Sequence, residues 1–451
     1  MAKQFKKTNL ATAVSIAAMS LGLSTAANAV VVVGGDNGWE VSFDGNVNAF
    51  YTLTDYDAGF TSLGYVNPGA AGFDANGANG LVPELDSARV TSGYLPAFFS
   101  FNVKSPTVNG MTATARISFA PVIQNANGKN QFYANQLAGS NGGVQGLQGS
   151  GIDTREVVVN IDAEFGTFSF GRTLSIFGRQ AMLKDQTLFG VGAPNKQSGS
   201  ISAGRTGRGY TYPNFNARFS YKTPTVMGVQ AEFGLYDPSV EQNVFNTSGG
   251  TLLNETDTPR FEGELTYTTT FNNGSFQLWM DGMWQDIESN QQGASGDVTV
   301  AAVGFGADVK MNGFNVLGYY YDGQGLGRSL QFVGGTRCEA QGVICQEADN
   351  EGYYVQGSYT FSGKTKLSGS WGESKEEGFS AINAGLNHSA MANSPDVKLN
   401  MWTVGVYHDM TSWMKVVAEY SNLENKYDNS TSNISGKTEA DVFSLGAFLF
   451  W

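Results

Sequence analysis

The sequence has few charged residues, little proline and almost no cysteine or histidine. Charged residues make up 15% of the 451 positions, and there are 11 prolines, 2 cysteines and 2 histidines. Aromatic residues reach 12% and glycines number 58. A disordered chain would have few aromatic residues and many charges, so this composition excludes disorder. A helical soluble enzyme would have about a quarter charged residues and far less glycine, so that class is also disfavoured.

The chain lacks long apolar runs as well. After Leu23 no stretch of about 18 or more apolar residues occurs, so no transmembrane helix is expected. The first 29 residues combine a basic start, a mostly apolar stretch over 10–23 and the small residues Ala27-Asn28-Ala29. This pattern predicts a cleaved secretory signal peptide, the alternative being an amphipathic helix of the mature protein.

Removal of the signal peptide at Ala29 would leave a single domain, 30–451. The full chain has a net charge of -13, and the removed segment contains Lys3, Lys6 and Lys7 but no acid, so the mature chain would have a net charge of -16. A strongly acidic chain is a poor match for nucleic acid, which is therefore not an expected partner.

Apolar and polar residues alternate along the rest of the chain. Between Trp39 and Leu53, for example, every second residue is apolar or small, and most of the residues between them are polar. This period of two is typical of strands with one apolar and one polar face. It predicts sixteen strands, near 39–54, 94–104, 111–121, 154–163, 167–173, 208–222, 228–237, 259–269, 275–285, 298–309, 314–322, 352–361, 364–373, 398–408, 413–422 and 438–451.

The connections between these strands differ in length. Short turns, such as 362–363 and 409–412, separate long polar loops, such as 55–87, 122–152 and 174–207. A soluble sandwich is the alternative, but its strands average about 5 to 6 residues and one domain rarely holds sixteen of them. Longer strands with an apolar outer face and aromatic ends favour an all-β fold, a transmembrane antiparallel β-barrel of about 16 strands.

Three motifs resemble those of the Gram-negative outer-membrane general porins. The last strand, 443–451, ends on an aromatic residue, Trp451, where that family usually has Phe. The segments Asp153-Thr154-Arg155 and Glu164 to Arg172 are similar to the family's fourth and fifth strands, and Tyr221 to Gly228 is similar to its turn after the sixth strand.

The resemblance implies a trimer of sixteen-stranded barrels in an outer membrane, each with a water-filled pore narrowed by the third long loop. That loop corresponds here to Thr173–Gly207, and Asp185 is its only acid. The chain lacks the Pro-Glu-Phe-Gly-Gly stretch of the enterobacterial branch. The implied function is passive diffusion of small hydrophilic solutes and ions, without a chemical reaction, a cofactor or a metal.

Basic residues gather around this loop. Between Gly166 and Lys222 there are eight basic residues and one acid, which predicts a constriction that prefers anions. We assign the constriction to Arg155, Arg172, Arg179, Asp185, Arg205, Arg208 and Arg218, and the pore lining to Arg116, Tyr210, Tyr212, Asn214 and Lys222.

Two alternatives stay open for these residues. The arginines could instead pair with acids of other strands, with Glu156, Asp162, Glu232, Glu262 and Glu264 as the candidates. The orientation of Arg155 is also open, because Val157, Val158 and Val159 leave the register of its strand ambiguous. A solute-specific channel for anionic or aromatic molecules is the alternative function, with Tyr210 and Tyr212 as contacts.

Cys338 and Cys345 lie in one long loop of a chain predicted to be exported, where disulfides persist. We expect them to form a disulfide, because a metal site would need more Cys or His nearby. The two histidines, His388 and His408, have no serine or carboxylate at a catalytic spacing, so an enzyme is not expected.

Overall fold

The structure is a computed structural model that describes residues 30–35, 37–57, 87–121, 123, 152–194, 202–239, 253–289, 297–338, 345–379, 394–429 and 434–451. The predicted signal peptide, 1–29, lies outside the described residues. Within the described part, no helix is both long and apolar enough to cross a membrane.

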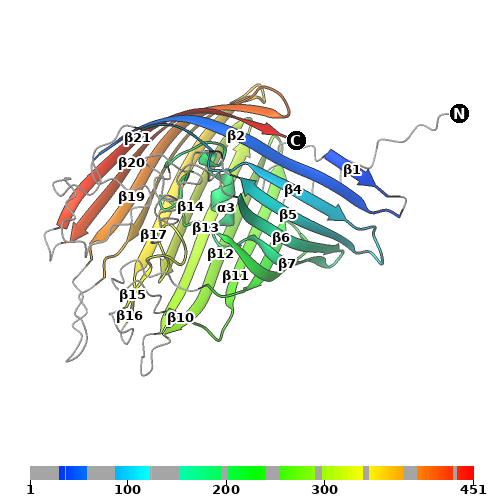
Figure 1. Ribbon diagram of the computed structural model, residues 1–451, viewed down its shortest axis with the longest axis horizontal. Coiled ribbons are helices and arrows are strands. Elements are labelled where there is room, and N and C mark those ends of the chain that lie inside the picture. Colours follow the sequence, from blue (N-terminus) through cyan, green and yellow to red (C-terminus); the bar gives the residue numbers. More distant parts are fainter. Residues whose placement is uncertain are drawn as a thin grey trace, which may run out of the picture.

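Most of the described strands form one antiparallel sheet that closes into a barrel of sixteen strands (Figure 1). One of the sixteen positions is shared by two short strands, β3 and β4, which both pair with β2. The barrel strands are β2 (Glu40–Tyr56), β3 (Ser87–Thr91) with β4 (Phe98–Lys104), β5 (Thr112–Pro121), β6 (Ile152–Ala163), β7 (Gly166–Leu174), β8 (Phe215–Lys222), β9 (Val229–Tyr236), β11 (Arg260–Phe271), β12 (Gly274–Ser289), β13 (Val298–Met311), β14 (Phe314–Gln324), β17 (Asp349–Phe361), β18 (Thr365–Glu376), β19 (Asp396–Asp409), β20 (Met414–Asn429) and β21 (Ile434–Phe450).

Pairing of the first and last barrel strands closes the sheet. The register of β2 and β21 runs from Asn46 opposite Phe450 to Tyr56 opposite Ala440. Beyond the end of β21, the short strand β1 (Val30–Gly34) continues the pairing along β2. The terminal Trp451 packs its ring on those of Phe43 and Phe99, at centroid distances of 5.6 and 5.4 Å. The aromatic terminus therefore covers the seam where the barrel closes.

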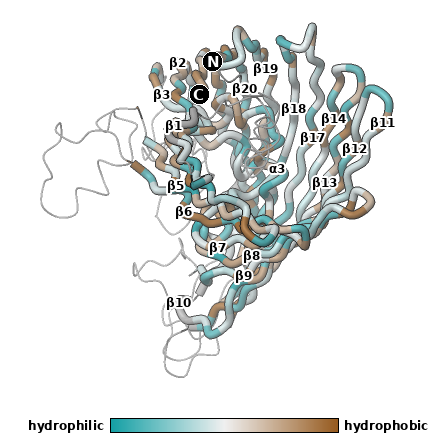
Figure 2. The backbone as a smooth tube through the Cα atoms, turned by 90° about the vertical axis from the view of Figure 1, so that its right-hand side faces the viewer, coloured by the Kyte–Doolittle hydropathy of each residue, from teal (hydrophilic) through white to brown (hydrophobic). Residues whose placement is uncertain are grey.

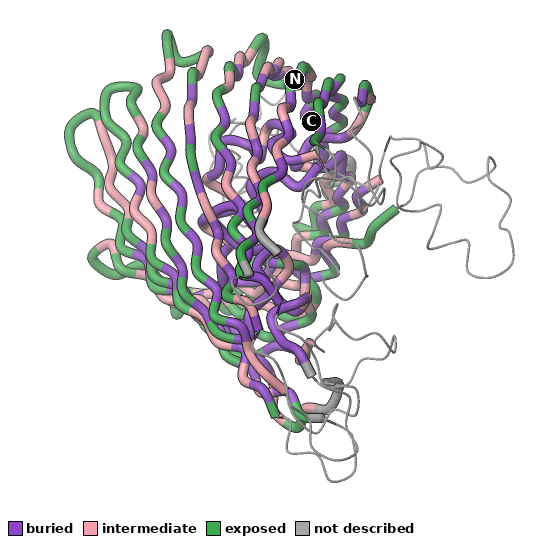
Figure 3. The backbone as a smooth tube through the Cα atoms, turned by 90° about the vertical axis from the view of Figure 1, so that its left-hand side faces the viewer, coloured by how far each residue is buried: buried purple, intermediate pink, exposed green. Residues whose placement is uncertain are grey.

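Two opposite faces follow from the period of two. On β12, Leu278 and Met280 point outward and are 43% and 44% exposed, whereas Trp279 and Asp281 point inward and are buried. The same alternation of apolar and polar residues, and of exposed and buried ones, runs along the other barrel strands (Figure 2 and Figure 3). The apolar side chains thus form the outer surface of the barrel.

The second predicted strand, 94–104, was placed wrongly at its start. The chain leaves the barrel wall after β3, and β4 begins only at Phe98. Between them, the backbone N–H of Tyr94 donates to the carbonyl of Gly190 and that of Leu95 to Leu188, at 2.8 and 3.0 Å. These hydrogen bonds to a segment inside the barrel replace the strand pairing that the alternation predicted.

The sixth predicted strand, 208–222, was wrong over its first part, because β8 begins at Phe215. Tyr210, Tyr212 and Asn214 alternate as in a strand, but Gly207 and Gly209 have φ angles of 75° and 137° and turn the chain inward. Only glycine adopts such angles without strain.

The outer face can be tested with two neighbouring residues of β12. Leu278→Lys would place a charge against lipid and should lower the free energy of unfolding in bilayers by about 2 kcal/mol. Gln277→Lys is the matched control, because Gln277 points to the interior at nearly the same depth. Equal losses of stability for both variants, in denaturant titrations of folded protein in vesicles, would contradict the assignment of the faces.

Candidate functional site

The connection between β7 and β8, residues 175–214, enters the barrel, and we call it the lumen loop. Its described residues are 175–194 and 202–214, and they contain the helix α3 (Arg179–Lys184) and the 3-10 helix η2 (Gln186–Phe189). Figure 1 shows α3 inside the barrel. The side chain of Asp185 accepts a hydrogen bond from the backbone N–H of Thr187 and so caps η2.

One side of the lumen loop packs on an apolar part of the inner wall. Phe177, Ala181, Met182 and Leu188 of the loop are buried there, together with Leu174 at the end of β7. The wall contributes inward side chains of β12, β13, β14 and β17, among them Trp279, Met283, Leu317, Tyr319, Tyr321 and Tyr354. Burial of these apolar surfaces holds the loop against this side of the barrel.

Wall carboxylates bind the backbone of the lumen loop at its start. Glu262 accepts hydrogen bonds from the N–H groups of Ile176 and Phe177, at 2.7 and 2.9 Å. Asp281 accepts one from the N–H of Gly178 at 2.9 Å. Amides that leave a strand lose their strand partners, and these carboxylates replace them and fix where the loop turns inward.

A third wall carboxylate, Glu419 of β20, binds the loop after η2. It accepts hydrogen bonds from the N–H groups of Val191 and Gly192, at 2.7 and 3.3 Å, and from the hydroxyl of Tyr407. A side chain at position 190 would collide with this carboxylate, because a Cβ added to Gly190 would lie 2.1 Å from it. The loop is therefore held at both ends of its helical part, on opposite sides of the barrel.

Ion pairs fasten α3 to the wall between these points. Arg179 lies 2.9 Å from the carboxylates of both Glu232 and Glu264, and Glu232 also pairs with Arg218 at 3.1 Å. Burial disfavours the charged form of Arg179, but the two carboxylates outweigh burial and raise its pKa. At the other end of α3, Lys184 pairs with Asp308 at 2.8 Å.

Two arginines of the predicted constriction are buried completely. Arg205 donates to the carbonyl of Met401 at 3.0 Å and lies 3.5 Å from Asp185. Arg208 donates to the carbonyls of Asn400 and Glu424 at 2.7 and 3.1 Å, and burial lowers its pKa. Both side chains therefore bind the loop to the wall and do not face the open lumen.

The assignment of Arg172 to the constriction was wrong. This residue is exposed and shares the outward face of β7 with Phe168 and Phe170. Its register partners, Val157 and Ala217, also point outward. The period of two applied to β7 alone would have placed it there, so the error came from counting charge along the sequence without regard to face.

Arg155 occupies a bulge, where the pairing of β5 and β6 shifts between Ser118 and Phe119. Its guanidinium lies 3.1 Å from Asp153, donates to the hydroxyl of Tyr212 at 3.1 Å and stands over the ring of Phe215. The bulge explains why the valines at 157–159 left the register of this strand ambiguous, and it turns Arg155 toward Tyr212 of the lumen loop.

The remaining pore-lining residues fall into different environments. Arg116 points inward and pairs with Asp44 and Glu156 at 2.8 and 2.7 Å. Tyr210 is fully buried and donates to Asp185 at 3.0 Å, so it does not line an open pore. Tyr212 is half-buried, Asn214 is exposed on the lumen loop, and Lys222 is half-buried on the inward face of β8.

Several residues of this site were missed from the sequence. Pairing of the arginines with acids of other strands was left open as an alternative, and Glu156, Glu232 and Glu264 form such pairs. Asp281, Asp308 and Glu419 were not singled out. Their inward parity on predicted strands was readable from the sequence, but their contact with the lumen loop depends on how the barrel closes.

A second loop covers the lumen loop from the side of the long connections. Between β14 and β17, Ser329 accepts a backbone hydrogen bond from Tyr212 at 2.9 Å, and Gly327 accepts one from the Thr211 hydroxyl at 3.1 Å. The same loop contains the hairpin of β15 (Thr336–Cys338) and β16 (Cys345–Glu347), in which Cys338 is opposite Cys345. Cys345 is disulfide-bonded. In the described residues, no group of three or more His, Cys, Asp or Glu side chains could hold a metal ion.

The role of Glu419 can be tested directly. Glu419→Ala removes the acceptor for Val191 and Gly192, which should weaken loop docking by about 2 kcal/mol and increase current fluctuations in single-channel recordings. Glu351→Ala is the control, because Glu351 is exposed on the outward face of β17. Steady currents identical to wild type in the Glu419 variant would show that this carboxylate does not hold the loop.

Comparisons with known proteins agree with this geometry. A family model described as Gram-negative porin matches residues 11–429. No curated protein gives a significant match. Among solved structures, the outer membrane channel DcaP of Acinetobacter baumannii is similar with a TM-score of 0.59 at 14% identity, covering 94% of this chain and 100% of that chain.

Two further structures share the fold at low identity. The anion-selective porin from Comamonas acidovorans has a TM-score of 0.55 at 12% identity, covering 92% of this chain and 100% of that one. OmpT of Vibrio cholerae has a TM-score of 0.51 at 14% identity, covering 94% and 100%. With its closed sixteen-stranded barrel and a family match over most of its length, the chain belongs to the Gram-negative porins and forms an outer-membrane channel.

Proposed function

We propose that the protein conducts small hydrophilic solutes and ions by passive diffusion through a water-filled lumen, which the lumen loop narrows. The observation that carries this proposal is the attachment of α3 and η2 across the interior by Glu262, Asp281 and Glu419. A segment fixed in this way leaves less of the cross-section for solutes than an open barrel of this size.

The solute would meet the partly exposed side of the lumen loop. Arg179, Gln180, Leu183, Lys184 and Phe189 keep partial exposure, whereas most of the other side chains between 174 and 193 are buried. These five residues would form the loop side of the throat. The two basic side chains among them, Arg179 and Lys184, are held in place by ion pairs with acids of the barrel wall.

The residues to which we assign an anion preference differ from those predicted from the sequence. Arg208 is buried and Arg218 is paired with Glu232. Lys222 and Lys366 point inward, are half-buried, and form no ion pair with any described carboxylate. Lys366 stands 4.5 Å from the ring centroid of Tyr407. We therefore assign a weak anion preference to Lys222 and Lys366.

The structure gives less support than the sequence did to the alternative function, a solute-specific channel. That alternative relied on Tyr210 and Tyr212 as contacts for an aromatic or anionic solute. Tyr210 is fully buried within the lumen loop, and the Tyr212 hydroxyl accepts a hydrogen bond from Arg155. Passive diffusion needs no such contacts and is the function we propose.

Selectivity can be measured as a reversal potential in a salt gradient. Replacing Lys222 and Lys366 together by Gln should shift the permeability ratio toward cations by about two-fold at low salt, and less at high salt because of screening. Lys426→Gln is the control, because Lys426 is exposed and paired with Glu424. A wild-type channel that already prefers cations would contradict the assignment.

We also propose that the protein is exported with a signal peptide cleaved after Ala29 and assembles as a homotrimer. The first described residue, Val30, begins β1, which pairs with β2 and so gives the proposed mature terminus a place in the structure. The long loop at 122–152, which resembles the family's contact with a neighbouring subunit, lies almost entirely outside the described residues.

The assembly proposal predicts about three chains per particle. Chemical cross-linking in mild detergent should give dimer and trimer bands. A boiled sample that was not cross-linked should show only the monomer. A shortened 124–151 loop should reduce the trimer fraction without loss of the folded monomer. A monomer under all mild conditions would refute the trimer.

A further inference from the structure

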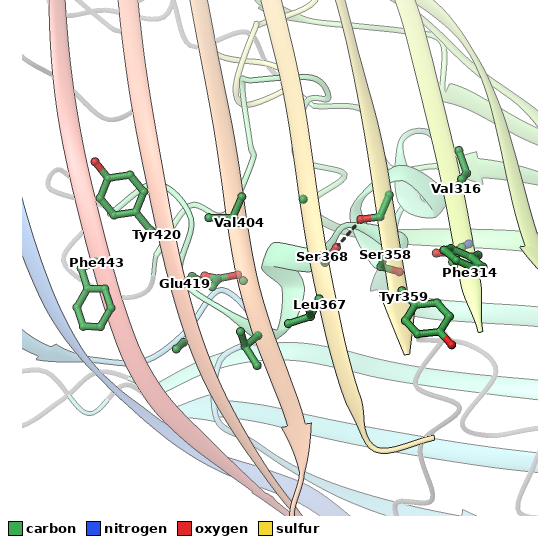
Figure 4. Close-up of a pocket in the computed structure, with 16 residues that line it drawn as sticks. Phe314, Val316, Ser358, Tyr359, Leu367, Ser368, Val404, Glu419, Tyr420 and Phe443 are labelled. Atoms are coloured by element: carbon green, nitrogen blue, oxygen red, sulfur yellow. Dashed lines mark hydrogen bonds between the residues drawn. The ribbon is translucent and has the colours of Figure 1, made fainter. Parts of the chain in front are cut away.

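A shallow apolar groove of about 740 Å³ lies on the outer face of the barrel, over β14 and β17 to β21 (Figure 4). Its outward side chains include Val316, Val404 and Phe443, which are 61%, 50% and 43% exposed. They belong to the apolar surface that faces lipid. The groove lies on the lipid side of these strands, whereas the lumen loop contacts Ser368 and Glu419 from their inner side.

Two adjacent glycines create the hollow. Gly357 of β17 is the register partner of Gly369 of β18, and both occupy outward positions. A Cβ added to Gly357 would have no atom within 4 Å, and one added to Gly369 would have its nearest neighbour at 3.8 Å. Neither glycine is therefore required by the packing of the barrel itself.

Valines bound the hollow on both sides. Val316 is the register partner of Gly357, and Val404 is the partner of Gly369. Since neighbouring strands are about 4.8 Å apart, the two valines lie about 14 Å apart with no side chain between them. This gap is wider than one hydrocarbon chain.

Rings close the end of the groove nearest the short turns. Phe314 packs on Tyr359 with a centroid distance of 4.5 Å, and Leu367 is the register partner of Tyr359. On the far side, the hydroxyl of Tyr420 donates to Asp441 at 2.8 Å, which fixes the ring beside the groove. The rim is therefore apolar and ordered by specific contacts.

A cation lies at the tip of the same hairpin that carries the glycines. Lys364 is exposed in the turn between β17 and β18 and forms no ion pair with any described carboxylate. The nearby Asp409 is paired with Lys415. Gly369 is five residues from Lys364, about 17 Å along the strand, which corresponds to a depth of about 12 Å for a strand tilted by about 45°.

That depth is within one leaflet, whose hydrocarbon is about 15 Å thick. We propose that the groove binds an acyl chain of an anionic phospholipid of the short-turn leaflet, whose phosphate is held by Lys364. Charge complementarity at the tip and the apolar hollow above it match the two ends of such a lipid. A phospholipid satisfies both features with one molecule.

Native mass spectrometry of the folded protein in detergent, titrated with phosphatidylglycerol, tests the proposal. Wild type should retain one lipid per chain, and Gly357→Leu and Gly369→Leu, which fill the hollow, should each need about tenfold more lipid for the same occupancy. Gly263→Leu is the matched control. Gly263 is an outward glycine of β11 outside the groove, and a Cβ there would make only ordinary contacts.

Lys364→Gln separates the headgroup from the chain. It should reduce retention of phosphatidylglycerol to the level of phosphatidylcholine and leave phosphatidylcholine unchanged. Each variant is first checked for the heat-dependent gel mobility of a folded barrel, and Gly369→Val replaces the leucine variant if that one does not fold. Unchanged lipid retention in the groove variants would overturn the proposal. A change of oligomeric mass in these variants would also overturn it, because the groove would then contact a second copy of the chain.

Discussion

The hydrogen bonds between wall carboxylates and the backbone of the lumen loop are the interaction on which the rest of the interior depends. A barrel wall satisfies its own backbone groups through strand pairing, but a loop that crosses the interior leaves the wall and loses those partners. Glu262, Asp281 and Glu419 supply them at the two points where the loop turns. Because these carboxylates come from β11, β12 and β20, the loop is held from opposite walls.

This arrangement changes the meaning of the basic residues around the loop. Counted along the sequence, they make a positive segment in an acidic protein. In the structure, Arg179, Lys184 and Arg218 each face an acid of the wall, and Arg205 and Arg208 are buried against carbonyls. Most of these basic side chains thus bind the loop to the wall or pair with acids of the wall, and little of their charge is available to passing ions.

Much of the barrel could be predicted from the sequence, and the interior could not. A period of two is a local property, so strand positions and the outward faces of β2, β9 and β12 followed from residue type alone. The starts of β4 and β8 did not, because Tyr94 and Tyr210 alternate like strand residues, but Tyr94 binds the lumen loop and Tyr210 belongs to it. Contacts such as that of Glu419 with Val191 join residues more than 200 positions apart, and only closure of the barrel brings them together. Arg172 shows that face must be assigned before charge is counted.

The central claim, that the attached lumen loop sets the size of the throat, is tested most directly by removing its helical part. A chain in which residues 179–189 are replaced by a short Gly-Ser linker keeps every barrel strand. Liposome swelling with uncharged sugars and polyethylene glycols of increasing size would give the exclusion limit of the folded variant and of wild type. The account predicts a clearly larger limit for the variant, whereas the same limit in both proteins would contradict it.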